Sequence, residues 1–145
     1  MSTKELQQKI AETMKKWQKI ENASVSSTGQ IIEKTDNPVV RQIMEIIQLD
    51  SQVHHRIQQL IIDSFERQSF SLSPEELADV WGSIEKHIEL EKQTVKFAGE
   101  AIESLKGKKM VVQEYLLNYL LTDEQKHNTV LEDLEKIKKG MYPYG

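Results

Sequence analysis

The sequence has 145 residues, carries 19 basic and 23 acidic side chains for a formal charge of −4, and contains no cysteine. The lack of cysteine excludes disulfides and zinc–thiolate sites, and the lack of a basic stripe interleaved with aromatic residues argues against a nucleic-acid partner. The N-terminal segment is polar, and no window approaches the roughly 20 apolar residues of a membrane span. We therefore expect a soluble, cytoplasmic protein without a membrane partner, folded as a single domain over residues 1–145.

The first half of the chain predicts two long helices. The first is expected over residues 3–34, although residues 22–29 are poor in helix-forming residues and are expected to be irregular. Asn37-Pro38 is typical of a helix start, because a capping side chain precedes a proline at the first helical position. The second helix is expected to continue from Pro38 to about Arg67.

The second half of the chain predicts two more helices. Ser73-Pro74-Glu75-Glu76 combines a capping box with a proline at the first helical position, so the third helix is expected to begin there. The segment Lys106-Gly107-Lys108 is expected to end it, and the fourth helix is expected to stop at Gly140. For the tail Met141-Tyr142-Pro143-Tyr144 we expect either an aromatic cap on one bundle end or a contact in a homo-oligomer.

Four long helices joined by short links favour one fold class. The fold is predicted to be all-α, an antiparallel up-down-up-down four-helix bundle. The link between the second and third helices is about five residues long, which allows a hairpin and no long crossover connection.

Ionisable residues interrupt the apolar stripes of these helices. On the first helix Glu21 is the candidate, although the stripe there fits Ile20 equally well. The second stripe is Val40, Ile43, Ile47, Asp50, His54, Ile57 and Ile61. The third is Leu77, Trp81, Ile84, Ile88, Glu91, Val95, Ala98, Ile102 and Leu105, and the fourth is Leu117, Leu120, Glu124, His127, Leu131 and Leu134.

These polar residues are expected to share one layer of the bundle. At about 1.5 Å of rise per residue, the six ionisable residues lie within about one turn of the same level when counted from the predicted turns. They are Glu21, Asp50, His54, Glu91, Glu124 and His127. Asp50…His54 and Asp123…His127 also align in a faint internal repeat with an offset of about 73 residues. The repeat favours Asp123 as the fourth-helix carboxylate, whereas the heptad phase favours Glu124.

Two further histidines lie near this layer. His87 stands one turn before Glu91, where it would either complete a ligand shell or hydrogen-bond a ligand. His55 is next to the second stripe and is expected to be solvated.

A layer of four carboxylates requires compensation. Burying a carboxylate without a partner costs on the order of several kcal/mol of folding free energy, because the charge is removed from water. Four carboxylates together also repel one another. Two divalent cations would balance the four charges, and two neutral imidazoles would complete the ligands. Carboxylate-rich sites with imidazole favour iron or manganese, with zinc as a further alternative.

At this point the sequence resembles the ferritin-like di-iron carboxylate superfamily. Those bundles take one Glu from each of two helices and a Glu-x-x-His from each of the other two. Glu124-Gln125-Lys126-His127 matches one Glu-x-x-His literally, and Glu21 and Glu91 match the single-Glu positions. The other Glu-x-x-His is not literal, because Asp50 stands four residues before His54. The short second link is closer to hemerythrin-like bundles, and His87…Glu91 looks like their His-x-x-x-Glu step.

The resemblance implies a dinuclear metal centre held by Glu21, Asp50, His54, His87, Glu91, Glu124 and His127, with iron as the first choice of metal. It also implies oxygen-dependent redox or ferroxidase-type activity, although an enzyme and a metal store or sensor have the same ligands. A non-catalytic assembly bundle, in which the polar layer only specifies helix register, is the alternative from a different class.

Overall fold

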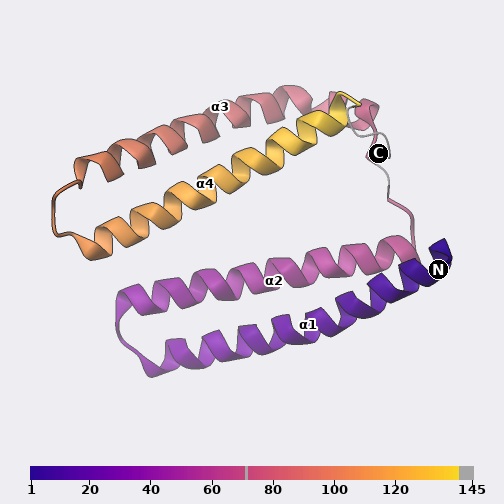
Figure 1. The fold of residues 1–145 in the computed structure, drawn as a ribbon, viewed down its shortest axis with the longest axis horizontal. Coiled ribbons are helices and arrows are strands. Elements are labelled where there is room, and N and C mark those ends of the chain that lie inside the picture. Colours follow the sequence, from indigo (N-terminus) through magenta and orange to yellow (C-terminus); the bar gives the residue numbers. More distant parts are fainter. Residues whose placement is uncertain (71, 141–145) are drawn as a thin grey trace. The chain divides into compact units, whose positions relative to one another are not determined.

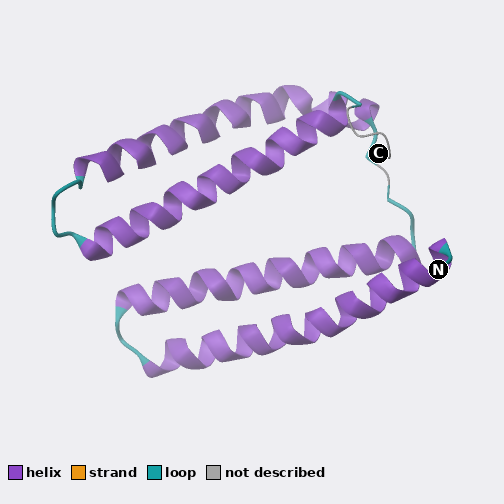
Figure 2. Ribbon diagram, viewed as in Figure 1, coloured by secondary structure: helices purple, strands orange, loops and turns teal. Residues whose placement is uncertain are grey.

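The computed structural model describes residues 1–70 and 72–140, and these residues form four helices with no strand among them (Figures 1 and 2). The helices are α1 (Thr3–Lys34), α2 (Pro38–Glu66), α3 (Pro74–Ser104) and α4 (Val111–Lys138). The all-α prediction is confirmed. No helix in this part of the chain combines the length and apolar character needed to cross a membrane. The tail from Met141 onward, to which a cap or an oligomer contact was assigned above, lies outside the described residues.

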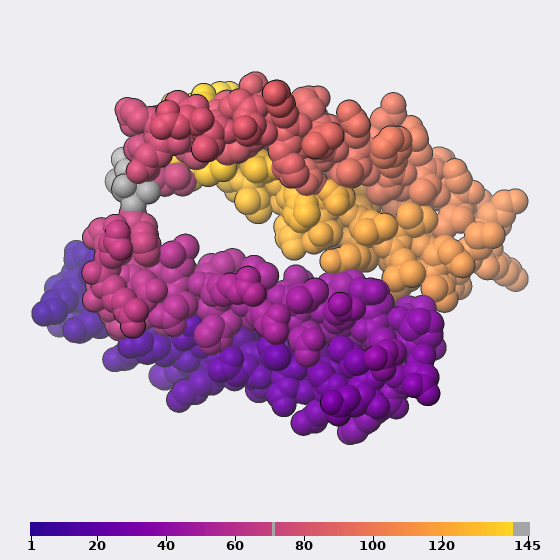
Figure 3. All heavy atoms as spheres, turned by 180° about the vertical axis from the view of Figure 1, so that it is seen from behind, coloured from indigo at the N-terminus to yellow at the C-terminus, as the bar shows by residue number. Residues whose placement is uncertain are grey.

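The helices pack in pairs, and the chain divides into two compact units, Met1–Phe70 and Ser71–Gly145. In the first unit α1 and α2 form an antiparallel hairpin, and in the second α3 and α4 do the same (Figure 1). Within each hairpin the side chains of the two helices meet along a continuous seam (Figure 3). This pairing is consistent with a helical bundle, and the single domain over residues 1–145 stays a prediction.

The helix ends follow from the capping residues. Asn37 Oδ1 accepts hydrogen bonds from the backbone N–H groups of Val39 and Val40 at 3.0 and 3.1 Å, which begins α2. Ser73 and Glu76 form a reciprocal capping box at the start of α3, since Ser73 Oγ accepts from Glu76 N and the Glu76 carboxylate accepts from Ser73 N. Gly107, with φ of 75°, provides the left-handed residue in the turn that follows α3.

Residues 22–29 are helical, so the expectation of an irregular segment was wrong. Their small side chains allow α2 to approach closely. Ser24 Oγ and Ser51 Oγ share a hydrogen bond of 2.8 Å, and Gln48 Nε2 donates to the carbonyl of Val25 at 3.2 Å. A Cβ on Gly29 would lie 3.3 Å from Gln48 Nε2, so a larger residue there would crowd the seam. Contacts between the helices therefore outweigh the weak helix propensity of this segment.

The seam between α1 and α2 is mostly polar. Glu21 is 6% exposed whereas Ile20 is 66% exposed, so the stripe of α1 runs through Glu21. The residues that α2 buries are Ser51, Gln58 and Ile62, each one position along from the predicted stripe. Ile47 and Ile57 on that predicted stripe remain 41% and 50% exposed. The difference arises because small and amide side chains of α2 hydrogen-bond α1 at close range, so the branched side chains lie to one side of the seam.

The seam between α3 and α4 follows the predicted stripe of α3. Leu77, Glu91 and Ala98 are buried, and Ile84 between them is half-buried, which is a strict seven-residue repeat. On α4 no residue is fully buried, and Leu117, Glu124, His127 and Leu131 are half-buried. The heptad phase of α3 therefore carries Glu91 into the middle of this seam.

We predict that Gln58→Met stabilises the protein. Gln58 is 4% exposed and its Oε1 has no hydrogen-bond partner among the described residues, which leaves a desolvated acceptor uncompensated. Methionine has a similar volume and no such group, so the free energy of unfolding should rise by about 1 kcal/mol. Urea denaturation would measure it.

Gln59→Met is the matched control, because the Gln59 side chain accepts from Gln18 Nε2 and donates to Asp63 Oδ1. The Gln59→Met substitution should lower the free energy of unfolding, because these two hydrogen bonds are lost. Equal changes in the two variants would show that the acceptor of Gln58 carries no cost.

Candidate metal centre

Glu91 is the central side chain of the second hairpin. It is 8% exposed, and both of its carboxylate oxygens have imidazole partners. His87 Nε2, one turn earlier on α3, lies 2.8 Å from Glu91 Oε1. His127 Nδ1, on α4, lies 3.3 Å from Glu91 Oε2. The buried carboxylate is thus held between a histidine of its own helix and one of the opposite helix.

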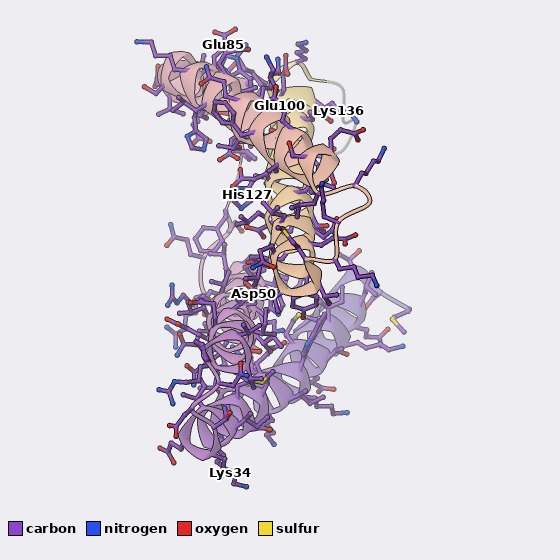
Figure 4. All side chains as sticks on the ribbon, turned by 90° about the vertical axis from the view of Figure 1, so that its left-hand side faces the viewer. Lys34, Asp50, Glu85, Glu100, His127 and Lys136 are labelled. Carbon is purple, nitrogen blue, oxygen red and sulfur yellow. The ribbon has the colours of Figure 1, made fainter. Side chains whose placement is uncertain are left out.

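His127 projects from α4 (Figure 4). A carboxylate lies near each of its ring nitrogens. Its Nδ1 faces Glu91 and also lies 3.7 Å from Glu124 Oε2. Its Nε2 lies 3.3 Å from Asp123 Oδ2. If Nε2 carries the proton and donates to Asp123, the Nδ1 lone pair points toward two carboxylates. That tautomer leaves Nδ1 available as a ligand.

Glu124 is held in place across the seam by Thr94. The Thr94 hydroxyl lies 2.8 Å from Glu124 Oε2 and 2.7 Å from the carbonyl oxygen of Glu91, and it can donate to either. The sequence left open whether Asp123 or Glu124 is the carboxylate of α4 at this site. In the structure both lie beside His127, on different sides of its ring. Glu124 lies on the Nδ1 side of His127 together with Glu91, and Asp123 lies on the Nε2 side, where it also pairs with Lys126 at 2.9 Å.

The two glutamates of the seam perturb each other's titration. A hydrogen bond with Glu124 is the main reason that the pKa of Glu91 is lowered, and contacts with His127 and His87 add to this against the opposing effect of burial. The same hydrogen bond with Glu91 raises the pKa of Glu124, which burial reinforces and Thr94 partly offsets. Two carboxylates at close range disfavour each other's ionised form, and in this pair Glu124 is the one whose pKa is raised.

This donor set fits a divalent cation. Among the described residues, Glu91, Glu124 and His127 are the group of potential ligands whose atoms all lie within 4.8 Å of one another. Two ligands at right angles on an ion with bonds of ~2.1 Å lie about 3 Å apart. The 3.3 and 3.7 Å separations of His127 Nδ1 from the two glutamate oxygens are close to that value. Two carboxylates and one imidazole suit iron, manganese or zinc.

The first hairpin holds the remaining predicted ligands in a looser arrangement. Glu21 Oε1, buried in α1, lies 3.5 Å from Nδ1 of His54, whose side chain is 54% exposed. Asp50 lies exposed on α2 (Figure 4). Its side chain makes no hydrogen bond or ion pair within the described part of the chain. His55, expected to be solvated, is half-buried beside the seam because it lies on the same side of α2 as Ser51 and Gln58.

Sequence reasoning missed Thr94 and the role of Asp123 as a partner of His127 Nε2. Thr94 stands three residues after Glu91, so helical spacing alone could have placed it beside the glutamate. The contact of the Thr94 hydroxyl with Glu124 depends on how α3 packs against α4, and the sequence does not specify that packing. Ligation by any of the seven predicted residues stays a prediction.

Comparisons with protein-family models, with curated proteins and with solved structures find no match to this chain. Any functional assignment therefore depends on the residues and contacts described above.

We predict that, in the absence of metal, Glu124→Gln stabilises the protein at pH 7 and Glu91→Gln destabilises it. The pKa of Glu124 is raised, so its ionised form opposes folding above that pKa, and the penalty vanishes as the pH falls below the ordinary value of 4.5. The pKa of Glu91 is lowered, so its ionised form favours folding above 4.5, and this contribution is lost as the pH falls through the lowered value.

Thermal midpoints in a chelating buffer between pH 7 and pH 4 would test both signs. The difference in thermal midpoint between each variant and the wild-type chain should become smaller as the pH approaches 4. Destabilisation by Glu124→Gln at pH 7 would contradict a strained carboxylate pair.

Proposed function

We propose that this chain is a divalent-metal-binding protein whose principal ligands are Glu91, Glu124 and His127 of the α3–α4 hairpin. The observation that carries the proposal is the convergence of the Glu91 carboxylate and Glu124 Oε2 on His127 Nδ1, at 3.3 and 3.7 Å. A neutral imidazole nitrogen with two carboxylates is a common ligand set for first-row transition metals.

The neighbouring side chains would prepare these ligands. Asp123 would accept the Nε2 proton of His127 and so direct the Nδ1 lone pair inward, as carboxylates commonly do for metal-bound histidines. His87 would orient one oxygen of Glu91, and Thr94 would orient one oxygen of Glu124. The pKa of Glu124 is raised, so the positive charge of a bound cation would favour the ionised form that the neighbouring Glu91 disfavours.

A ferritin-like dinuclear centre is the more specific form of the proposal. Glu21 and His54 bring a second carboxylate and imidazole in the first hairpin, and the repeat of Asp50…His54 and Asp123…His127 supports related roles for the two hairpins. A bound ion supplies Lewis acidity, and iron or manganese also supplies one electron per ion for reaction with dioxygen. Ferroxidase-type activity with iron(II) as substrate is the corresponding reaction, and storage or sensing without turnover needs the same ligands.

A structural role is the competing function, and one observation favours it. Both oxygens of Glu91 already face imidazoles, and the Thr94 hydroxyl lies within hydrogen-bond distance of Glu124, so these two carboxylates have protein partners without an ion. The layer would then serve to fix the register of α3 against α4. Glu124→Leu separates the two functions, because an apolar replacement stabilises a purely structural layer and abolishes metal-dependent stabilisation.

We predict that iron(II) or manganese(II) raises the thermal midpoint of the wild-type protein. A ligand that binds only the folded state adds about 2.7 kcal/mol at a hundredfold excess over its dissociation constant. Differential scanning calorimetry under anaerobic conditions, with magnesium(II) as the control for general charge screening, would measure the shift. An unchanged midpoint with both transition metals would contradict the proposal.

We also predict that His127→Ala weakens metal binding by at least about tenfold, the usual size for a lost ligand or its direct partner, whereas His55→Ala leaves it unchanged. Calorimetric titration gives both the affinity and the number of ions per chain. Two ions would support the dinuclear form, and one ion abolished by His127→Ala would support the α3–α4 site alone. Equal losses in the two variants would place the site elsewhere.

A further inference from the structure

A polar hollow lies on the first hairpin, and none of the candidate metal ligands lines it. It has a volume of about 420 Å³ and is lined by Asn22 and Val25 of α1 and by Gln52, His55 and Arg56 of α2. None of the five lining residues is acidic, although 23 of the 145 residues of the chain are. Glu21, next to Asn22, is buried in the seam and faces His54 at 3.5 Å.

Arg56 differs from the other two arginines of the chain. Arg41 donates to the carbonyl oxygens of Ile32 and Thr35 at the end of α1, and Arg67 pairs with Asp63 at 3.7 Å. The guanidinium of Arg56 has no ion pair and no hydrogen bond to any described residue. An arginine without a protein partner, at the edge of a hollow, leaves all five of its N–H groups available.

The other polar side chains around the hollow are also free of protein partners. Asn22 and Gln52 make no side-chain hydrogen bond within the described part of the chain, and of His55 only the backbone carbonyl is engaged, by Gln18 Nε2 at 3.2 Å. Each side-chain amide offers two N–H donors, and a neutral imidazole offers one in either tautomer. The hollow therefore gathers one fixed positive charge and several N–H donors, with no competing carboxylate.

We propose that this hollow, formed by Asn22, Gln52, His55 and Arg56, is a binding site for a small oxyanion, a phosphate or a carboxylate. The planar guanidinium of Arg56 matches either group with two parallel N–H···O bonds, and the two amides and the imidazole donate to the remaining oxygens. The volume exceeds that of a bare phosphate, so the oxyanion is the recognised end of a small organic molecule or is bound together with water.

The test is a titration of the 145-residue chain, followed by the backbone amide signals in ¹H–¹⁵N NMR spectra. Inorganic phosphate and succinate serve as separate probes, at an ionic strength held constant with sodium chloride. The expected result is a saturable shift, with at least one of the two probes, of the signals of residues 22, 52, 55 and 56. The probe that binds more tightly identifies the class of oxyanion.

Variants decide whether the hollow is responsible. Arg56→Gln should weaken the binding by at least about tenfold, because a charge-assisted bidentate contact is lost. Arg67→Gln, which removes an equal charge at the C-cap of α2, should leave it unchanged. Arg56 is exposed, so its variant should keep the thermal midpoint of the wild type.

Glu124→Gln should not affect the titration, which separates this site from the proposed metal centre. Shifts that do not saturate, or that are equal in the two arginine variants, would overturn the proposal.

Discussion

The burial of one carboxylate, that of Glu91, is the constraint on which the second hairpin depends. A buried charge is tolerated only when other groups compensate it, and here His87, His127 and Glu124 all contact Glu91 from within hydrogen-bond or ion-pair distance. The heptad of α3 places Glu91 in the seam, and the facing turn of α4 must then present polar groups. Packing, charge and candidate chemistry in α3–α4 all follow from this requirement.

The two hairpins meet the problem of a polar seam in different ways. Between α1 and α2 the contacts are mainly neutral, through Ser24 with Ser51 and through Gln48 with a backbone carbonyl, and Glu21 faces a single histidine. Between α3 and α4, acidic and imidazole groups converge. The first seam therefore brings together mostly neutral groups. The second contains a carboxylate pair in which one pKa is lowered and the other raised, an arrangement that frequently marks a functional site.

Much of the fold could be predicted from single residues. Asn37-Pro38 and Ser73-Pro74 marked the starts of α2 and α3, because capping and proline effects act locally. The phase of α3 was correct because its period of seven is unbroken. The face that α2 turns toward α1 was displaced by one position from the prediction. Small and amide side chains occupy the seam in place of isoleucines, and hydropathy alone does not predict this.

For the candidate site, Glu91, Glu124 and His127 could be found by spacing. The position of His87 beside Glu91 also follows from spacing, because the two stand one turn apart on α3. The separate roles of Asp123 and Thr94 could not be found in this way, because they depend on rotamers and on distances between helices.

The most direct measurement of the proposed metal centre is the ¹⁵N NMR spectrum of the histidine rings during a titration with zinc(II), a diamagnetic substitute for iron(II). Metal bound at Nδ1 of His127, with the proton retained on Nε2 beside Asp123, should produce a large shift of the Nδ1 resonance that is complete at a fixed ratio of metal to protein. The ring signals of His55 should not change. A titration that leaves the His127 ring unaltered, or that shifts Nε2 in place of Nδ1, would contradict a metal centre built on Glu91, Glu124 and His127.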